Sequence, residues 1–144
     1  MLKNKDRQII AYLRRDAKVK LTTVAKELQM PTSTVYEKVN NSQGIISRHV
    51  CLVDFKKLGY LARVVLALKA GRNDKEKLRD YLIQDENVNT LSKINNGFDL
   101  MAEIVFEDMR KVEDFKDKIK LLFQIDEMRE YYILRDLKKE TFLS

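Results

Sequence analysis

The sequence is poor in the residues that hold metals and carry out catalysis. It contains one cysteine, Cys51, and one histidine, His49. One cysteine permits no intrachain disulfide and no cysteine-rich zinc site, and a single histidine among strand residues is far more often structural than catalytic. The sequence also shows no paired nucleophile and base and no glycine-rich phosphate loop. We therefore expect no enzyme activity, no cofactor and no metal site, with Cys51 as a small buried apolar residue.

Long apolar runs are also absent. No stretch approaches the roughly 20 apolar residues that a membrane-spanning helix needs. Residues 1–6 do not form the apolar region of a secretory signal. The sequence therefore predicts a cytoplasmic location and no membrane partner.

Positive charge is concentrated in the first part of the chain. The 144 residues carry a formal net charge of +6. Residues 1–60 hold 12 Lys and Arg against 5 Asp and Glu, or +7, whereas residues 61–144 hold 16 against 17, or −1. Such a partition indicates a part that faces nucleic acid and a neutral part with another task. A basic surface kept only for solubility would not predict it.

Residues 21–46 have the pattern of two short helices joined by a tight turn. A narrow apolar face over 21–28 predicts the first helix. Pro31 favours the start of the second, in which Val35 and Val39 are the buried positions. The other positions carry hydrogen-bonding side chains that would face away from the core, as a helix in the major groove requires: Thr32, Ser33, Tyr36, Glu37, Asn40 and Asn41. An ordinary three-helix bundle with a polar outer face would show the same pattern, so the motif alone leaves both interpretations open.

Three flanking segments complete the first part of the chain. An amphipathic pattern over 4–16 predicts a helix that backs the helix pair. Residues 45–53 are rich in β-branched side chains, so we expect a wing strand there. The segment 54–60, DFKKLGY, is then predicted to link a DNA-binding domain over 1–53 to the rest of the chain.

From residue 61 onward the pattern predicts six elements. They are a strand, a helix, two strands, a helix and a strand, over 61–70, 74–84, 88–94, 98–106, 109–123 and 128–135. Asn95-Asn96-Gly97 between the two middle strands is a strong hairpin signal. The order is that of a ferredoxin-like βαββαβ domain, which we place over 61–144. The whole chain is therefore expected in the α+β class, with an N-terminal winged helix-turn-helix.

Both helices of such a domain cover one face of its sheet, which leaves the other face open. Val65, Ala67, Met101 and Val105 lie on the open face among polar neighbours. A half-apolar face without cover favours self-association, so we expect a homodimer through the C-terminal sheets. The alternative is an ordinary solvated face of an antiparallel sheet.

Several motifs together resemble the Lrp/AsnC, or feast/famine, family of transcription regulators. They are Ala25-Lys26-Glu27-Leu28, Thr34-Val35, Gly44-Ile45-Ile46, Leu52-Val53-Asp54, Leu58-Gly59-Tyr60 and Gly97-Phe98-Asp99-Leu100. The resemblance spans nearly the whole chain. It implies a dimer made through the C-terminal sheets, often assembled into tetramers or octamers, that binds palindromic DNA. In some members an amino acid is sensed at interfaces between dimers.

Three features depart from the family pattern. The family's recognition helix is usually longer and rich in arginine, whereas here Lys38 is its only base. The turn between the helices has Gln29-Met30 where helix-turn-helix motifs often place glycine. Either a β-carbon stands at positive φ, at a cost on the order of 1 kcal/mol, or the turn differs from the usual one. The family's Gly-Asp-aromatic-Asp effector turn becomes Asn96-Gly97-Phe98-Asp99 and loses its first acid. These changes weaken the expectation of amino-acid sensing more than that of DNA binding.

The leading hypothesis is a homo-oligomeric, sequence-specific, DNA-binding transcription regulator. In the recognition helix an asparagine can pair with adenine, a lysine with guanine and a glutamate with the cytosine amine. The residues expected to contact double-stranded DNA are Thr32, Ser33, Tyr36, Glu37, Lys38, Asn40, Lys18, Lys20 and Arg48. An amino-acid effector would bind near Asn96, Gly97 and Asp99, although a hairpin turn alone explains the same residues.

Two other classes of function remain open. One is an assembly module whose N-terminal domain no longer reads DNA sequence, which the single base in the recognition helix favours. The other is an enzyme similar in fold to haem-pathway decarboxylases, which would be expected to use basic and histidine side chains around a tetrapyrrole. His49 alone gives that enzyme little support.

Overall fold

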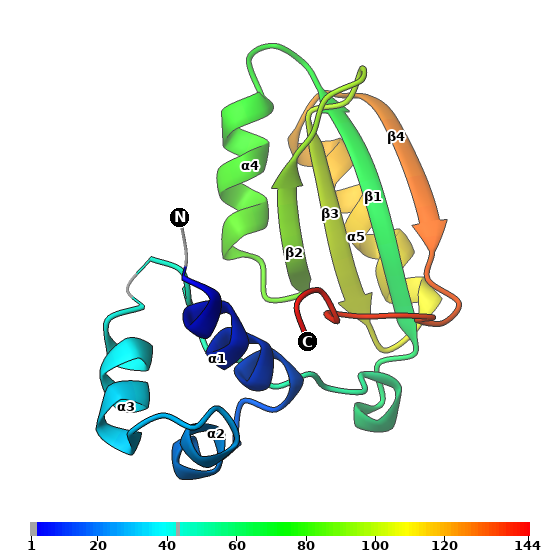
Figure 1. Cartoon of the computed structure of the whole chain (residues 1–144). Coiled ribbons are helices and arrows are strands. Elements are labelled where there is room, and N and C mark those ends of the chain that lie inside the picture. The colour runs from blue at the N-terminus through cyan, green and yellow to red at the C-terminus, as the bar shows by residue number, and fades with distance from the viewer. Residues whose placement is uncertain (1–2, 43) are drawn as a thin grey trace. The chain divides into compact units, whose positions relative to one another are not determined.

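The chain divides into two compact units (Figure 1). The computed structural model describes residues 3–42 and 44–144. One unit comprises Met1–Val53 with Leu137–Ser144, and the other comprises Asp54–Asp136. The sequence placed residues 137–144 with the C-terminal domain, but here they group with the first unit. Arg14 holds this tail, because its Nε donates a hydrogen bond to the carbonyl of Phe142 at 3.0 Å.

The first unit is built on three helices, α1 (Asn4–Arg15), α2 (Leu21–Glu27) and α3 (Thr32–Asn40). The spans of α1 and α2 match the predicted ones to within one residue. The helices meet in a small core whose buried members are Ile9, Val24, Ala25 and Val35. Ala25 is only 1% exposed, and its short side chain lets α3 cross α2 closely. α3 ends at Asn40, because two successive asparagines favour a helix end.

The predicted wing strand over 45–53 is wrong, since the structure has no strand in these residues. The backbone N–H groups of residues 47–53 donate no hydrogen bond to any described carbonyl. β-Branched residues favour an extended backbone, but a strand also needs a neighbouring strand to pair with. The prediction that Cys51 is buried is wrong for the same reason, because this unpaired segment leaves its side chain exposed.

The second unit contains a four-stranded sheet and two helices. In chain order they are β1 (Ala62–Ala70), α4 (Lys75–Gln84), β2 (Val88–Lys93), β3 (Leu100–Phe106), α5 (Met109–Leu122) and β4 (Ile125–Tyr132). A 3-10 turn, Lys56–Leu58, precedes them. All three strand pairs are antiparallel, and the strands lie in the order β2-β3-β1-β4. The predicted sequence of strand, helix, two strands, helix and strand is confirmed.

α4 and α5 pack on the same face of the sheet (Figure 1). Alternate residues of β1 and β3 point to that face and are buried, as their period of two predicts. The helices contribute five fully or nearly fully buried side chains to the same cluster: Leu78, Leu82, Val112, Phe115 and Ile119. The opposite face of the sheet is left without a helix in the described residues.

β4 begins at Ile125, three residues before its predicted start. It is an edge strand with many charged residues, so its sequence does not alternate between apolar and polar positions. Its position is set by pairing with β1, which aligns Ala70 with Ile125 and Val64 with Tyr132. Only the neighbouring strand defines where this strand starts.

The turn between α2 and α3 has a residue with a β-carbon at positive φ, the first of the two alternatives for Gln29-Met30. Gln29 has a φ of 52°, in the left-handed region. This conformation lets the N–H of Met30 donate to the carbonyl of Ala25 at 2.9 Å, which closes the turn. A residue with a β-carbon therefore occupies a position that suits glycine.

Replacing Gln29 by glycine is expected to raise the free energy of unfolding by up to about 1 kcal/mol, because glycine has no β-carbon to strain the turn. The net gain is smaller than the strain, since glycine also makes the unfolded chain more flexible. Urea unfolding of the full chain measures the change. Gln29→Ala keeps the β-carbon and is the matched control, with little change expected. Equal free energies for the two variants would show that the turn is unstrained.

Candidate nucleic-acid interface

One side of α3 is polar and open to solvent. We call it the outer face of α3 and define it by five exposed residues: Thr32, Ser33, Tyr36, Glu37 and Asn40. They are one, three or four positions apart, which at about 100° per residue brings them to one side of the helix. Tyr36 exposes 48% of its surface. The outer face offers hydroxyl, phenol, amide and carboxylate groups, and Glu37 is its single charged member.

The opposite side of α3 is fixed by packing. Val35 is fully buried against Ile9, Val24 and Ala25, and Val39 packs against the same cluster. Burying a valine side chain contributes about 1.5–3 kcal/mol. Rotating α3 about its axis would expose Val35, so this burial keeps the outer face turned to solvent.

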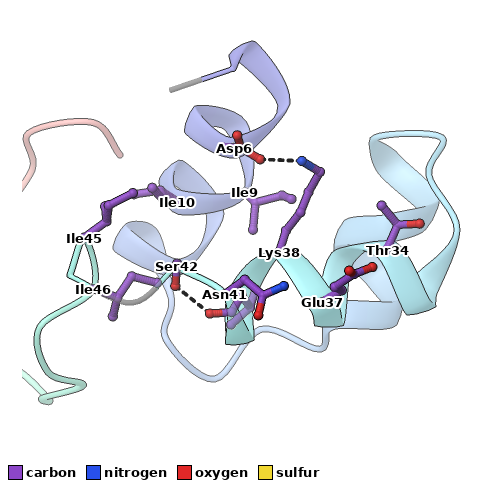
Figure 2. A pocket seen from close by; sticks show the side chains of 11 residues that line it. Asp6, Ile9, Ile10, Thr34, Glu37, Lys38, Asn41, Ser42, Ile45 and Ile46 are labelled. Carbon is purple, nitrogen blue, oxygen red and sulfur yellow. Dashed lines mark hydrogen bonds and ion pairs between the residues drawn. The ribbon is translucent and has the colours of Figure 1, made fainter. Parts of the chain in front are cut away.

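Lys38 does not belong to the outer face. It lies two positions from both Tyr36 and Asn40, so about 200° of rotation separates it from each. Its half-buried side chain reaches α1, where Nζ is 2.6 Å from Oδ1 of Asp6 (Figure 2). The hydrogen bond from Lys38 holds the pKa of Asp6 below its ordinary value. The sequence grouped Lys38 with the other DNA contacts, whereas the structure separates it from them.

Three other bases on the predicted list lie outside the helices. Lys18 and Lys20 are in the connection between α1 and α2, and Arg48 follows α3. All three are exposed, and none forms an ion pair with a described residue. Arg14 differs, because its guanidinium lies 3.3 Å from the carboxylate of Glu140. Lys18, Lys20 and Arg48 are therefore available to an anion.

A cavity of about 430 Å³ lies between α1, α3 and the residues Asn41, Ser42, Ile45 and Ile46 (Figure 2). Its apolar lining comes from Ile9, Ile10, Val39, Ile45 and Ile46. Asp6 and Lys38 also line the cavity, so their ion pair forms part of its wall. Side chains of α1 and α3 do not fill the space between the helices at this point.

The hairpin between β2 and β3 carries the predicted effector residues. Asn96 and Gly97 are exposed and have φ of 65° and 89°, as a two-residue hairpin turn requires. Asp99 accepts a hydrogen bond from the N–H of Ala70 at 2.9 Å through Oδ2. Its Oδ1 lies 3.1 Å from Nζ of Lys75. Both oxygens of this carboxylate thus hold the hairpin to the end of β1 and the start of α4.

The sheet face away from α4 and α5 is partly apolar. Ala67 pairs with Met101 across β1 and β3, and Met101 exposes 41% of its surface. Val65 is half-buried, while Val105 is 7% exposed. We call Val65, Ala67, Met101 and Val105 the open-face residues. Their arrangement on one face follows the predicted alternation.

Two residues that matter for these surfaces were not found by sequence analysis. Tyr131 pairs with Val65 and exposes 54% of its surface, so it extends the apolar part of the open sheet face. It was missed because β4 has no apolar alternation. Asp6 was missed because its partner Lys38 is 32 positions away. No local signal could have found that pair.

The described residues also bear on two other features, metal sites and membrane-spanning helices. No group of three or more His, Cys, Asp or Glu side chains in residues 3–42 and 44–144 is arranged to hold a metal ion. None of the helices in the same ranges is long and apolar enough to cross a membrane.

Known proteins whose sequences are similar to most of this chain are named as regulators of transcription. An uncharacterized HTH-type transcriptional regulator of Pyrococcus furiosus is 23% identical over 141 residues, which cover 95% of this chain and 93% of the relative. The HTH-type transcriptional regulator LrpC of Bacillus subtilis is 27% identical over 115 residues, covering 78% and 80%. No protein-family model matches the chain.

Solved structures show the same fold. The structure of Bacillus subtilis LrpC superposes with a TM-score of 0.86 at 23% identity and covers 96% of this chain and 98% of its own. Escherichia coli AsnC gives 0.85 at 17% identity, covering 96% and 97%. A Neisseria meningitidis transcriptional regulator, solved as its L-Met complex, gives 0.88 at 12% identity, covering 96% and 94%.

The relatives are named HTH-type transcriptional regulators, and this chain is similar to them over most of its length. Its fold is that of LrpC and AsnC, two regulators of the Lrp/AsnC kind. The resemblance that the sequence motifs indicated is therefore confirmed.

Proposed function

We propose that this chain is a homo-oligomeric, sequence-specific regulator that binds double-stranded DNA, with α2 and α3 as its helix-turn-helix. The observation that supports this most directly is the outer face of α3, whose five polar side chains are exposed while Val35 is fully buried. A helix of this kind fits the major groove with its polar side against base edges. Similarity to HTH-type transcriptional regulators along the chain supports the same function.

The side chains of this interface have separate tasks. Asn40 can make a paired hydrogen bond to adenine, and Glu37 can accept one from the cytosine amine. The hydroxyls of Thr32 and Ser33, at the start of α3, suit phosphate oxygens. The outer face has no base, so we expect attraction to the phosphate backbone to come from exposed residues outside α3: Lys18, Lys20 and Arg48.

Selection of binding sites from random duplex DNA tests this proposal. We expect an enriched, two-fold symmetric site whose half-sites lie about 34 Å apart or a multiple of it. Affinity for that site should fall with salt by about 0.9 log unit per tenfold change for each phosphate contact. The double variant Lys18→Ala/Lys20→Ala should therefore reduce the salt dependence by nearly two units for each half-site bound, while keeping the selected sequence.

The control for this experiment is Lys77→Ala, which removes one positive charge from α4 in the other unit and should leave the salt dependence unchanged. Binding without any enriched sequence would contradict the proposal. That result would favour the alternative of an assembly module that no longer reads DNA sequence.

The second unit is proposed to be a ferredoxin-like domain, reached through the linker 54–60, that joins two copies of the chain. Its open sheet face carries Met101 and Tyr131, two large and exposed side chains with apolar bodies. No helix covers this face within the described residues. A second copy would bury both side chains and would bring two outer faces to one DNA site.

Met101→Glu is expected to turn the dimer into a monomer, because it places a carboxylate in the middle of the proposed interface. Met101 is exposed in the single chain, so the fold should tolerate the change. Sedimentation equilibrium measures the mass against 17.0 kDa for one chain. Leu121→Glu on α5, where Leu121 is 86% exposed, is the matched control and should leave the mass unchanged. A wild-type chain that sediments as a monomer would contradict the interface.

An amino-acid effector bound near Asn96, Gly97 and Asp99 is a second proposal. The fold shared with a regulator that was solved as its L-Met complex supports it. The carboxylate of Asp99 already has two partners, so a ligand would have to use other groups of the hairpin. Thermal shift of the full chain with each of the twenty amino acids tests the proposal, and the absence of a shift with all of them would remove it.

A further inference from the structure

The first turn of α1 makes two polar contacts with the helix pair behind the outer face. Nζ of Lys5 donates a hydrogen bond to the carbonyl of Leu28 at 2.9 Å, at the end of α2. The next residue, Asp6, accepts one from Nζ of Lys38 at 2.6 Å, in the last turn of α3. Two adjacent residues of α1 thus contact the end of α2 and the end of α3.

The ion pair lies where apolar packing is missing. The cavity beside it separates the first turn of α1 from the end of α3, although both helices line it (Figure 2). Ile9, one turn further along α1, is the buried contact nearest to the pair in sequence. Two contacts therefore hold the end of α3: Val39 packs against the core, and Lys38 pairs with Asp6 at the cavity.

The direction of Lys38 excludes it from the outer face. Its Cβ lies about 200° around the helix from those of Tyr36 and Asn40. Its side chain is 29% exposed and that of Asp6 is 24% exposed, so both are partly withdrawn from solvent. A lysine in this position satisfies a carboxylate of its own chain.

We propose that Asp6 and Lys38 form a clamp that sets the position of α3 for DNA binding, so that Lys38 is a positioning residue and makes no DNA contact. This inference rests on the proposed DNA-binding function and identifies what holds its recognition helix. The clamp, together with the packing of Val39, fixes the end of α3 that carries Asn40, while Val35 fixes its middle. Without the clamp, the end of α3 can shift away from the base edges.

The salt dependence of DNA binding separates positioning from contact. Lys38→Met is expected to lower affinity for the selected site by roughly tenfold, the cost of about one base contact. Because no phosphate contact is lost, the salt dependence should stay at the wild-type value. Lys20→Met is the matched comparison, and there the dependence should fall by about 0.9 for each half-site bound. A fall of about 0.9 with Lys38→Met as well would overturn the clamp.

An exchange of the two charges gives a second test. Lys38→Asp puts two carboxylates side by side and should lower affinity further than Lys38→Met does. Adding Asp6→Lys to that variant restores an ion pair with the charges reversed, and it should recover most of the lost affinity. A lysine that contacts DNA could not be rescued in this way, so the absence of recovery in a folded double variant would overturn the clamp.

Circular dichroism of each variant checks that the chain folds. If the exchanged pair does not fold, Lys38→Gln keeps a neutral hydrogen-bond donor towards Asp6, and its salt dependence decides between the same two outcomes. Failure of the clamp is distinct from failure of the proposed function. A wild-type chain that selects no DNA site removes the function and the clamp together. If the wild-type chain selects a site but a variant gives one of the contradicting results, only the clamp is removed.

Discussion

The burial of Val35 decides which side of α3 faces solvent, and the candidate interface depends on it. The core of the first unit has four buried members, one on α1, two on α2 and one on α3. With so few residues, a single fully buried side chain sets the rotation of its helix. The polar residues that follow at helical spacing are then turned outward together.

Because this core is small, polar contacts also help to fix the positions of the three helices. Lys5 and Asp6 contact the ends of α2 and α3 from one turn of α1. The turn between α2 and α3 is closed around Gln29 in a left-handed conformation. These features show how α3 is held in place beside a core of only four buried residues. They also explain why its one base faces α1 instead of solvent.

The second unit uses the same sheet for two purposes. One face carries both helices and the larger of the two cores. The other face combines apolar residues with an ion pair between Arg63 and Glu103 at 3.4 Å. Asp99 secures the hairpin at one end of the sheet. The net positive charge of the chain lies in the unit proposed to bind DNA, while the second unit is nearly neutral and offers a surface suited to another copy.

The sequence by itself determined the local elements, since periodic apolar residues located α1, α2, β1 and β3 to within two residues of their observed ends. It also determined the order of the second unit. Tertiary structure alone decided the rest. Residues 45–53 and β4 have strand-like or charged sequences whose state depends on a neighbouring strand. Lys38 meets Asp6 only because α1 packs beside α3, and a local pattern does not encode contacts between residues 32 positions apart.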